Sequence, residues 1–591
     1  MCGIVGFIGK SAGKNVIDKL KLLQYRGYDS AGIGICEKDR FMIQKCVGTV
    51  DDLGKICGNE ILNSSCAIGH TRWATHGKVC TQNAHPCEAG DVAVVHNGIF
   101  ENFVDIQSLV LGEGKTELDS LVFAKCFDKL LACETELSVK KVTKILHELL
   151  GQFVGAWAIC ALIRQCPGVI FFAKNRSPLV IGKGDGVVCL SSDPQSISDV
   201  CKYVCELNDG DFGWVSDKNV QVYNKFGKVS DKIWKQNIAY CDNTKLGDYS
   251  CFMEKEIEEG LPSVVDTLAN FPDDLKYRKL SLKNHFYLCG CGSAFNAGLC
   301  LKYWMGKFLH KQLDCFYASE FNLSASLHGR KSVGIFISQS GETADTIKCV
   351  EIAKANKNIT IGLVNTQDST LDKKCDYTLY TFAGKECAVA ATKTYVSQLA
   401  GGLTFVNMLA SQNGVNAINI AQLCAKLRNL DYNNVVGNIK NVVDEIKGKK
   451  SVFFIGRGVD YFIAKEAALK LKEITYIHVE AIPAGELKHG SLALIDSESV
   501  VICILSQSDL VKKTLNNVAE VKSRGGKVII FSPFKQVSDY ADIMVNVPQL
   551  NDEFMPFVLA KPLQLLALYT AKSMGINPDF PRNLAKSVTV E

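Results

Sequence analysis

The stretch that decides the fold of the C-terminal half reads His285-Phe286-Tyr287-Leu288-Cys289-Gly290-Cys291-Gly292-Ser293. Its first five residues are typical of a buried strand, the glycines predict a turn, and residues 294–308 have helical periodicity. The same order returns at residues 452–455, 456–458 and 461–474, and Gly456 stands 166 residues after Gly290.

A second pair of matching stretches shows that this half is duplicated. Ile337-Ser338-Gln339-Ser340 returns 168 residues later as Leu505-Ser506-Gln507-Ser508. Two anchors at nearly one offset indicate an internal repeat. Strand–helix alternation in each repeat predicts two doubly wound parallel-sheet α/β domains, at 276–415 and 443–581, with ligands beyond the carboxyl ends of the strands.

Residues 2–215 carry a different pattern, in which short strands are separated by turns. Strands are predicted at 3–9, 31–35, 67–70, 92–96, 154–163 and 169–173, and helices at 14–23, 120–132 and 138–150. Many strands and few helices predict stacked sheets with covering helices. Residues 216–248 are polar and show little periodicity, so we interpret them as a linker with an appended strand or helix.

The composition is that of an ordinary globular protein. A net charge of +4 argues against a dedicated nucleic-acid-binding protein. We expect no signal peptide, because the N-terminus has no positively charged region followed by a long apolar core. We expect no membrane span, because no run of 18 apolar residues occurs. The 25 cysteines are scattered, often within apolar stretches, and form no paired C-x-x-C set. We therefore expect reduced thiols, a cytoplasmic protein and no metal site.

Cys2 is unusual because removal of Met1 would give its thiol a neighbouring α-amino group. Such an amine has a pKa of roughly 7.7–8, so it is partly neutral at cellular pH. A thiol next to an amine is one recognised form of activated nucleophile. From Cys2 alone, a small buried thiol at a strand edge is the more common explanation.

Four polar clusters in the first domain favour an activated nucleophile at Cys2 over a buried thiol. They lie at residues 25–32, 70–77, 83–86 and 96–98. With Cys2, they resemble the motifs of the N-terminal-nucleophile (Ntn) glutamine amidotransferases. The whole chain, from residue 2 to residue 591, resembles the glutamine–fructose-6-phosphate amidotransferase (glucosamine-6-phosphate synthase) family. The resemblance implies an αββα glutaminase domain at 2–215, two sugar isomerase (SIS) domains and a catalytic tail at 582–591.

For the glutaminase half, the resemblance implies that the Asn97 side chain and the Gly98 N–H form an oxyanion hole. Arg72 is expected to bind the glutamine carboxylate, and Trp73 to gate ammonia transfer. The further glutamine-binding candidates are Arg26, Thr75, His76, His85 and Glu117. The family has an aspartate where this chain has Glu117, and Asp119 is the alternative ligand for the glutamine amino group.

For the sugar half, the loop at residues 338–343 resembles the phosphate cradle of SIS domains, and it opens a helix, whose N-terminus favours anions. The expected sugar-phosphate ligands are Ser293, Ser338, Gln339, Ser340, Thr343, Val389 and Lys470. In the second repeat Asp509 replaces the loop glycine and would repel a phosphate. We therefore predict one working phosphate site per chain.

Three further residues are assigned sugar chemistry by the resemblance. Glu466, Lys470 and Glu473 are spaced to share a helix face, and Glu473 resembles the base that moves a proton between C1 and C2. His489 resembles a residue that assists ring opening in the neighbouring subunit, which implies a homodimer. Lys586 corresponds to the lysine that forms a Schiff base with the open-chain sugar.

The resemblance implies conversion of fructose 6-phosphate and glutamine to glucosamine 6-phosphate and glutamate, the first step of UDP-N-acetylglucosamine synthesis. Ammonia would pass from Cys2 to Lys586, and no cofactor is required. Amidophosphoribosyltransferase and asparagine synthetase share the Cys2 start but lack the duplicated half. Two rival functions are a non-catalytic sugar-phosphate sensor and an isomerase half that uses free ammonia or acts as a deglycosylating hydrolase. Feedback by UDP-N-acetylglucosamine stays undecided.

Overall fold

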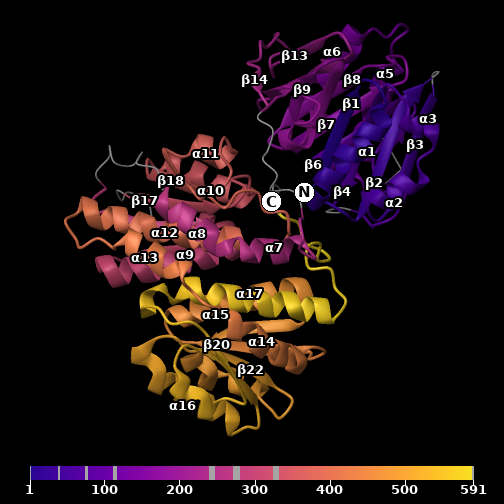
Figure 1. Cartoon of the computed structure of the whole chain (residues 1–591). Coiled ribbons are helices and arrows are strands. Elements are labelled where there is room, and N and C mark those ends of the chain that lie inside the picture. The colour runs from indigo at the N-terminus through magenta and orange to yellow at the C-terminus, as the bar shows by residue number, and fades with distance from the viewer. Residues whose placement is uncertain are drawn as a thin grey trace. The chain divides into compact units, whose positions relative to one another are not determined.

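The computed structural model describes residues 2–37, 40–73, 77–110, 116–237, 246–270, 280–323 and 332–588 (Figure 1). The chain divides into two compact units. Residues 1–242 with 587–590 form the first unit, and residues 243–586 with 591 form the second. Each unit has its own hydrophobic core.

Two antiparallel sheets form the centre of the first unit. Among the described residues, the larger sheet has the strand order β14 (Lys235–Gln236), β11 (Tyr203–Glu206), β9 (Val180–Gly184), β10 (Val187–Ser191), β1 (Gly3–Ile8), β4 (Cys66–Arg72), β2 (Ser30–Glu37) and β3 (Arg40–Val47). The smaller sheet has the order β13 (Val220–Tyr223), β12 (Asp211–Val215), β8 (Ile170–Asn175), β7 (Gly155–Ile163), β6 (Val92–Phe100) and β5 (Cys87–Ala89). The strand that follows Cys2 is thus central, between β10 and β4.

Helices cover the outer faces of both sheets. They are α1 (Ala12–Leu23), α2 (Val50–Ile56), α3 (Asn59–Leu62), α4 (Phe103–Val110), α5 (Asp119–Leu131) and α6 (Val139–Leu150). Successive strand residues point to opposite faces, so in β1 Ile4 enters the core between the sheets and Val5 packs with α1. In β6, Val95 enters the same core and Val94 packs with α5 and α6. The predicted αββα layering is confirmed.

The three predicted helices of this unit correspond to α1, α5 and α6, but α2, α3 and α4 were not predicted. These helices have seven, four and eight residues, too few turns to give a clear apolar period. One local signal was present for α2. Thr49 and Asp52 form a capping box in which the Asp52 N–H donates to Thr49 Oγ1 at 3.3 Å.

The stretch interpreted as a linker contributes strands to both sheets. β13 pairs with β12, and β14 pairs with β11. Between them, the Lys232 ammonium pairs with the Asp211 carboxylate of β12, and the two side chains are only 8% and 3% exposed. A buried charge that loses its partner is costly, so this ion pair attaches the segment to the first unit.

Replacement of Lys232 by methionine should destabilise the first unit by about 3–5 kcal/mol, because the buried Asp211 carboxylate loses its cation. The matched control is Lys235→Met, whose partner Glu206 lies 3.7 Å away in an exposed pair and which should cost less than about 1 kcal/mol. Urea-dependent hydrogen exchange of β12 peptides measures both free energies. Equal effects of the two substitutions would contradict the prediction.

The second unit contains two parallel sheets with the same strand order. In the described part of the chain, the first is β16 (Leu313–Tyr317), β15 (His285–Gly290), β17 (Ser332–Ser338), β18 (Ile359–Val364) and β19 (Tyr377–Tyr380). The second is β21 (His478–Pro483), β20 (Ser451–Gly456), β22 (Val500–Ile504), β23 (Lys527–Ser532) and β24 (Ile543–Asn546). β20 begins 166 residues after β15, which confirms the internal repeat and the doubly wound fold.

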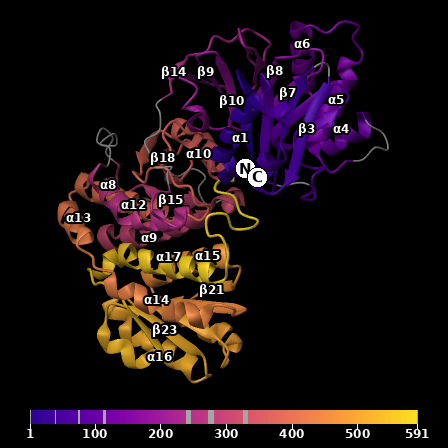
Figure 2. The ribbon, with the colours of Figure 1, turned by 45° about the vertical axis from the view of Figure 1, so that its right-hand side comes forward.

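Helices lie on both faces of each sheet (Figures 1 and 2). They are α7 (Phe252–Glu258), α8 (Gly260–Ala269), α9 (Gly292–Leu309), α10 (Ala344–Ala355), α11 (Thr370–Lys374), α12 (Lys393–Gln412), α13 (Ile420–Arg428), α14 (Asn433–Ile446), α15 (Val459–Thr475), α16 (Val511–Lys522) and α17 (Met555–Ser573). On the first sheet, α8, α9, α12 and α13 cover one face, and α10 and α11 cover the other. On the second, α14, α15 and α17 lie opposite α16.

One helical stretch, Asp552–Ser573, is long and apolar enough to cross a membrane by length and composition. Its most apolar window is 89% buried within the protein. α17, which makes up most of this stretch, packs with α14 and α15 in the core of the second repeat. Burial inside the fold accounts for its apolar composition.

Candidate active site

Cys2 lies directly before β1, beside the end of β4. The Trp73 backbone N–H donates to the Cys2 Sγ at 3.3 Å. Burial raises the pKa of the Cys2 thiol above its ordinary value. A thiol in this environment needs a nearby base to become a nucleophile at neutral pH.

Asn97 and Gly98 lie on β6, and the structure brings Asn97 to Cys2. The Asn97 Nδ2 group donates to the Cys2 carbonyl at 3.0 Å and to Ser192 Oγ at 2.9 Å. Gly98 has a φ of +127°, and a Cβ there would lie 1.9 Å from the Ala156 carbonyl oxygen. Only glycine fits this position without strain.

Two arginines expected at the glutamine site are buried in the first unit. Arg26 Nε donates to the Cys2 carbonyl at 3.2 Å, so it helps to hold the backbone of Cys2. Arg72 is 4% exposed at the end of β4, immediately before Trp73. His85 is also buried. Thr75 and His76 lie outside the described residues.

Glu117 and Asp119, the two candidate ligands for the glutamine amino group, differ in burial and in hydrogen bonding. Asp119 is buried at the start of α5 and accepts hydrogen bonds from Phe100 N at 3.0 Å and Ser120 N at 2.8 Å. Its carboxylate therefore holds β6 and α5 together. Glu117 is exposed and lies next to Gly77, so its carboxylate is the one that remains accessible.

In the second unit, the expected phosphate loop lies between β17 and α10. Ser338 Oγ accepts a hydrogen bond from Gly341 N at 3.0 Å and lies 2.9 Å from Thr343 Oγ1. Ser340 Oγ accepts from Glu342 N at 3.1 Å. Gly341 has a φ of +66°, and a Cβ there would meet Ser369 Oγ at 2.0 Å. An aspartate like the one in the second repeat would not fit this turn.

The matching loop of the second repeat is closed by internal carboxylates. Asp460 Oδ2 accepts from Ser506 N at 2.8 Å, and Asp552 Oδ2 accepts from both Ser508 N and Ser508 Oγ at 2.7 Å. The residue 166 positions before Asp460 is Ala294, so the first repeat has no carboxylate at that place. This contrast supports a single phosphate loop.

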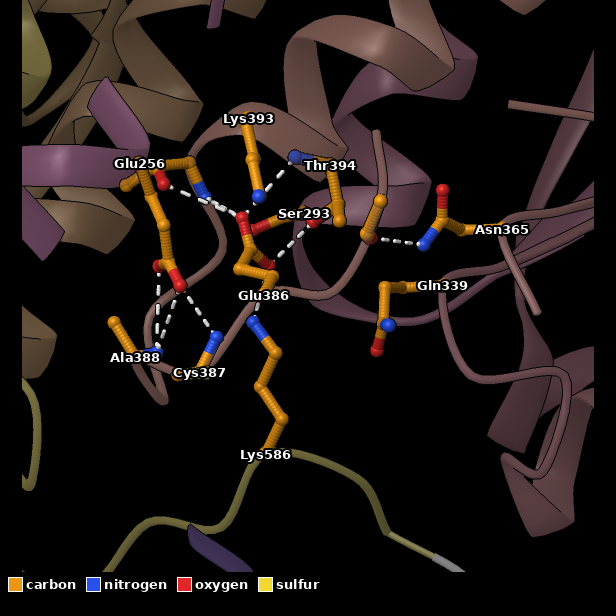
Figure 3. Close-up of polar contacts among 12 residues, drawn as sticks. Glu256, Ser293, Gln339, Asn365, Glu386, Cys387, Ala388, Lys393, Thr394 and Lys586 are labelled. Atoms are coloured by element: carbon orange, nitrogen blue, oxygen red, sulfur yellow. Dashed lines mark hydrogen bonds and ion pairs between the residues drawn. The ribbon is translucent and has the colours of Figure 1, made fainter. Parts of the chain in front are cut away.

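Lys586 reaches a buried carboxylate, that of Glu386 (Figure 3). The same carboxylate accepts hydrogen bonds from Thr392 N at 2.9 Å, Thr394 N at 3.1 Å and Thr394 Oγ1 at 2.6 Å. Burial acts to raise the pKa of Glu386, but the Lys586 ammonium and these donors outweigh it and lower the pKa to about 2. The pair is therefore ionic.

A second buried carboxylate holds the loop that carries Glu386. Glu256 of α7 accepts hydrogen bonds from Cys387 N and Ala388 N (Figure 3). The pKa of Glu256 is raised to about 8, mainly by burial and also by the negative charge of the neighbouring Glu386. The next residue, Val389, donates its N–H to the Asp579 carbonyl at 3.1 Å. The loop is thus attached to α7 and to the segment before the C-terminal tail.

The face predicted for α15 is present, with Glu466 and Lys470 buried and Glu473 half-buried. Lys470 Nζ lies 2.5 Å from Glu473 Oε2 and 3.6 Å from Glu466 Oε1. Glu466 also accepts from Ser293 Oγ and Asn296 Nδ2 of α9, both at 2.8 Å. Burial raises the pKa of Glu466 to about 7. Ser293 and Lys470 therefore meet at one carboxylate that joins the two repeats.

His489 is exposed at the end of the short helix Ala484–His489. Gln339 follows Ser338 in the phosphate loop, and its carbonyl accepts from Asn365 N at 3.1 Å. Within the second unit, the sequence-predicted sugar residues thus lie on the loop after β17, on α9, on α15, and on the segments around Val389 and Lys586.

Comparison with known proteins decides the family. Residues 279–408 and 445–574 each match the SIS domain family. The glutamine–fructose-6-phosphate aminotransferase (isomerizing) of Aquifex aeolicus is 36% identical over 603 residues, and that of Pyrococcus horikoshii is 35% identical over 604. Both matches cover all of this chain and all of the relative. This chain belongs to the glutamine–fructose-6-phosphate aminotransferase family.

A solved structure agrees with this membership. The C-terminal domain of glucosamine-fructose-6-phosphate aminotransferase from Francisella tularensis is 32% identical, with a TM-score of 0.52. It covers 57% of this chain and all of that domain. The paired SIS domains of the second unit therefore correspond to the C-terminal domain of this aminotransferase family.

Several residues of this aminotransferase family member were missed by sequence reasoning. Glu386, Glu256 and Asp579 lie in no motif, and their partners are up to hundreds of residues away. The sequence does carry a signal for Asp460. It stands in the second repeat at the place of Ala294, so alignment of the two repeats shows a change from alanine to a carboxylate.

Asp460 should make the stability of the second unit depend on pH, because burial raises its pKa to about 7. The folded state favours the protonated form, so the stabilisation is fully present below about pH 4 and is lost as the pH rises through about 7. Between these pH values the free energy of unfolding of the wild type should fall by a few kcal/mol relative to Asp460→Asn, since one pKa unit is about 1.4 kcal/mol.

Urea titrations of both proteins at several pH values, followed by hydrogen exchange of β22 peptides, measure this difference. Parallel pH profiles for the wild type and the asparagine variant would show that Asp460 titrates normally.

Proposed function

We propose that this chain converts fructose 6-phosphate and glutamine to glucosamine 6-phosphate and glutamate. The observation that carries the proposal is the full-length similarity to aminotransferases of that name, together with the Lys586–Glu386 pair at a SIS domain. The rival families that share the Cys2 start are disfavoured, because they lack a duplicated SIS half.

In the glutaminase step, Cys2 is the nucleophile. After removal of Met1, its amine takes the thiol proton, and the thiolate adds to the amide carbon of glutamine. The oxyanion that forms is stabilised by Asn97 Nδ2 and the Gly98 N–H. Ammonia leaves with a proton, and water then releases glutamate from the thioester. The short distance from Asn97 Nδ2 to the Cys2 backbone supports this assignment.

Glutamine is held by charges at both ends. Arg72 binds its carboxylate through a bidentate contact, and the exposed Glu117 binds its ammonium group. Arg26 positions the Cys2 backbone. Thr75, His76 and His85 are assigned as further glutamine ligands. Asp119 is the alternative to Glu117, but its carboxylate already accepts bonds from β6 and α5.

Ammonia passes from Cys2 to Lys586 inside the protein, and Trp73 gates the passage. Free ammonia in water is mostly ammonium, which is not a nucleophile, so an enclosed route preserves its reactivity. The contact of the Trp73 backbone with the Cys2 thiol supports a role for Trp73 next to the point of release.

In the sugar step, the phosphate binds to the loop of Ser338, Gln339, Ser340 and Thr343, whose hydroxyls lie before the N-terminus of α10. Lys586 first gives up its ammonium proton, its neutral amine adds to the C2 carbonyl of the open-chain sugar, and water leaves. Glu386 stabilises the positive charge of the resulting iminium, as it stabilises the ammonium now. Ammonia then displaces Lys586 from C2.

The last step is an isomerisation. Glu473 removes a proton from C1 and returns it to C2, and the proton of the C1 hydroxyl is transferred to the nitrogen. The C2 imine and C1 alcohol thereby become a C2 amine and a C1 aldehyde. Lys470 lies between Glu466 and Glu473, where it fixes the position of the base. Ser293 and the Val389 segment line the sugar, and the reaction needs no cofactor and no metal.

His489 is assigned to ring opening in a neighbouring subunit, so the working form is a homodimer. The exposure of His489 supports a role outside its own chain. The described cysteines are free thiols, which supports a cytoplasmic location. The chain is not expected to bind nucleic acid or a membrane. The alternative function is the isomerase half working alone with free ammonia.

The decisive test is glucosamine 6-phosphate formation from fructose 6-phosphate with either glutamine or ammonium as the nitrogen source. Cys2→Ala should lose at least about 10³-fold with glutamine, because the nucleophile is gone, and should keep activity with ammonium. Lys586→Met should lose both activities, since no imine forms.

Wild-type product from ammonium but not from glutamine would favour the isomerase-alone function. An equal loss of both activities in Cys2→Ala would contradict the division of labour between the two sites.

A further inference from the structure

A buried histidine, His70, contacts Asn97, the residue proposed for the oxyanion hole. His70 is on β4, paired with Ile4 of β1 and Gly32 of β2, and its side chain is fully buried. Its Nε2 atom lies 3.0 Å from Asn97 Oδ1 and 3.0 Å from the His96 carbonyl oxygen. His70 therefore connects the larger sheet to β6 at the residue that faces Cys2.

The contacts of Asn97 fix which way its amide points. The Cys2 carbonyl can only accept a hydrogen bond, so the group that faces it is Nδ2. Oδ1 must then face His70. Because Oδ1 and the His96 carbonyl are both acceptors, His70 carries its hydrogen on Nε2 and donates it to them. The amide orientation and the histidine tautomer thus determine each other.

His70 is also held in place and kept neutral. Its ring packs on His85 with the ring centroids 4.3 Å apart. Burial lowers the pKa of His70 to about 3, which favours the neutral ring. Nδ1 of His70 is buried without a hydrogen-bond partner among the described residues. Among the described residues, the hydrogen bonds of the His70 ring are therefore those that Nε2 donates.

We propose that His70 is a positioning residue for the glutaminase reaction, which donates to Asn97 Oδ1 and so keeps the Nδ2 donor facing the nucleophile. The inference rests on the proposed glutaminase function. Without the His70 donor, Oδ1 loses its hydrogen bond, and only the Cys2 carbonyl and Ser192 Oγ still hold Nδ2. The Asn97 amide is then held less firmly, and its Nδ2 donor is displaced from the developing oxyanion more easily. The transition state would lose a donor, while substrate contacts elsewhere would remain.

The test compares His70→Leu with His70→Gln in the full-length protein, because a glutamine amide places an N–H near the position of Nε2. His70→Leu should lower the glutaminase kcat by about 10²–10³-fold, the usual effect of losing one oxyanion donor, with little change in KM. His70→Gln should retain at least about ten times more kcat than His70→Leu.

Two measurements separate positioning from general damage. Alkylation of Cys2 by iodoacetamide, followed on the N-terminal peptide by mass spectrometry, needs the thiol but no oxyanion hole and should be unchanged. Ammonium-dependent glucosamine 6-phosphate synthesis reports the sugar site and should also be unchanged.

A near wild-type kcat in His70→Leu would overturn the proposal. So would a His70→Gln variant as impaired as His70→Leu, or a kcat loss matched by equal losses of alkylation and ammonium-dependent synthesis. If wild-type protein itself had no glutaminase activity, the proposed function would fail rather than the role of His70.

Discussion

The sugar half of this protein depends on one buried ion pair, between Glu386 and Lys586. A carboxylate in an apolar interior is costly unless it is paired and hydrogen-bonded. Here Thr392 and Thr394 donate to it, and Glu256 holds the following loop residues. The pair therefore orders a lysine close to the C-terminus, where a chain end is otherwise prone to fray, and it places a counter-ion beside the nitrogen of the proposed iminium.

The two repeats have equivalent folds, but small differences in their sequences give them different contacts. Both sheets have the same strand order, and each carries a Ser-Gln-Ser loop after its third strand in sequence. In the second repeat, Asp460 and Asp552 take up the donors that an anion would use. In the first, alanine stands in place of Asp460, and Gly341 allows the tight turn. The second repeat instead contributes α15 and its charged side chains.

Periodicity predicted most of the fold because it reports burial along one element. The strands β15 and β20, the helices α1, α5 and α6, and the repeat itself were predicted with small errors at their ends. Short helices such as α2 were not, and β13 and β14 were hidden in a polar stretch because they lie at sheet edges. Motifs pointed to Cys2, Asn97 and Lys586. They could not reveal Glu386 or His70 as partners, because those contacts join residues that only the folded chain brings together.

The most direct measurement for the proposed role of Lys586 is reductive trapping. The full-length protein is mixed with fructose 6-phosphate, reduced with sodium borohydride and digested, and the modified peptide is identified by mass spectrometry. An imine at Lys586 predicts a stable hexitol phosphate adduct on the C-terminal peptide, with less adduct in Glu386→Gln. An adduct on Lys470 instead, or no adduct that depends on the sugar, would contradict the account.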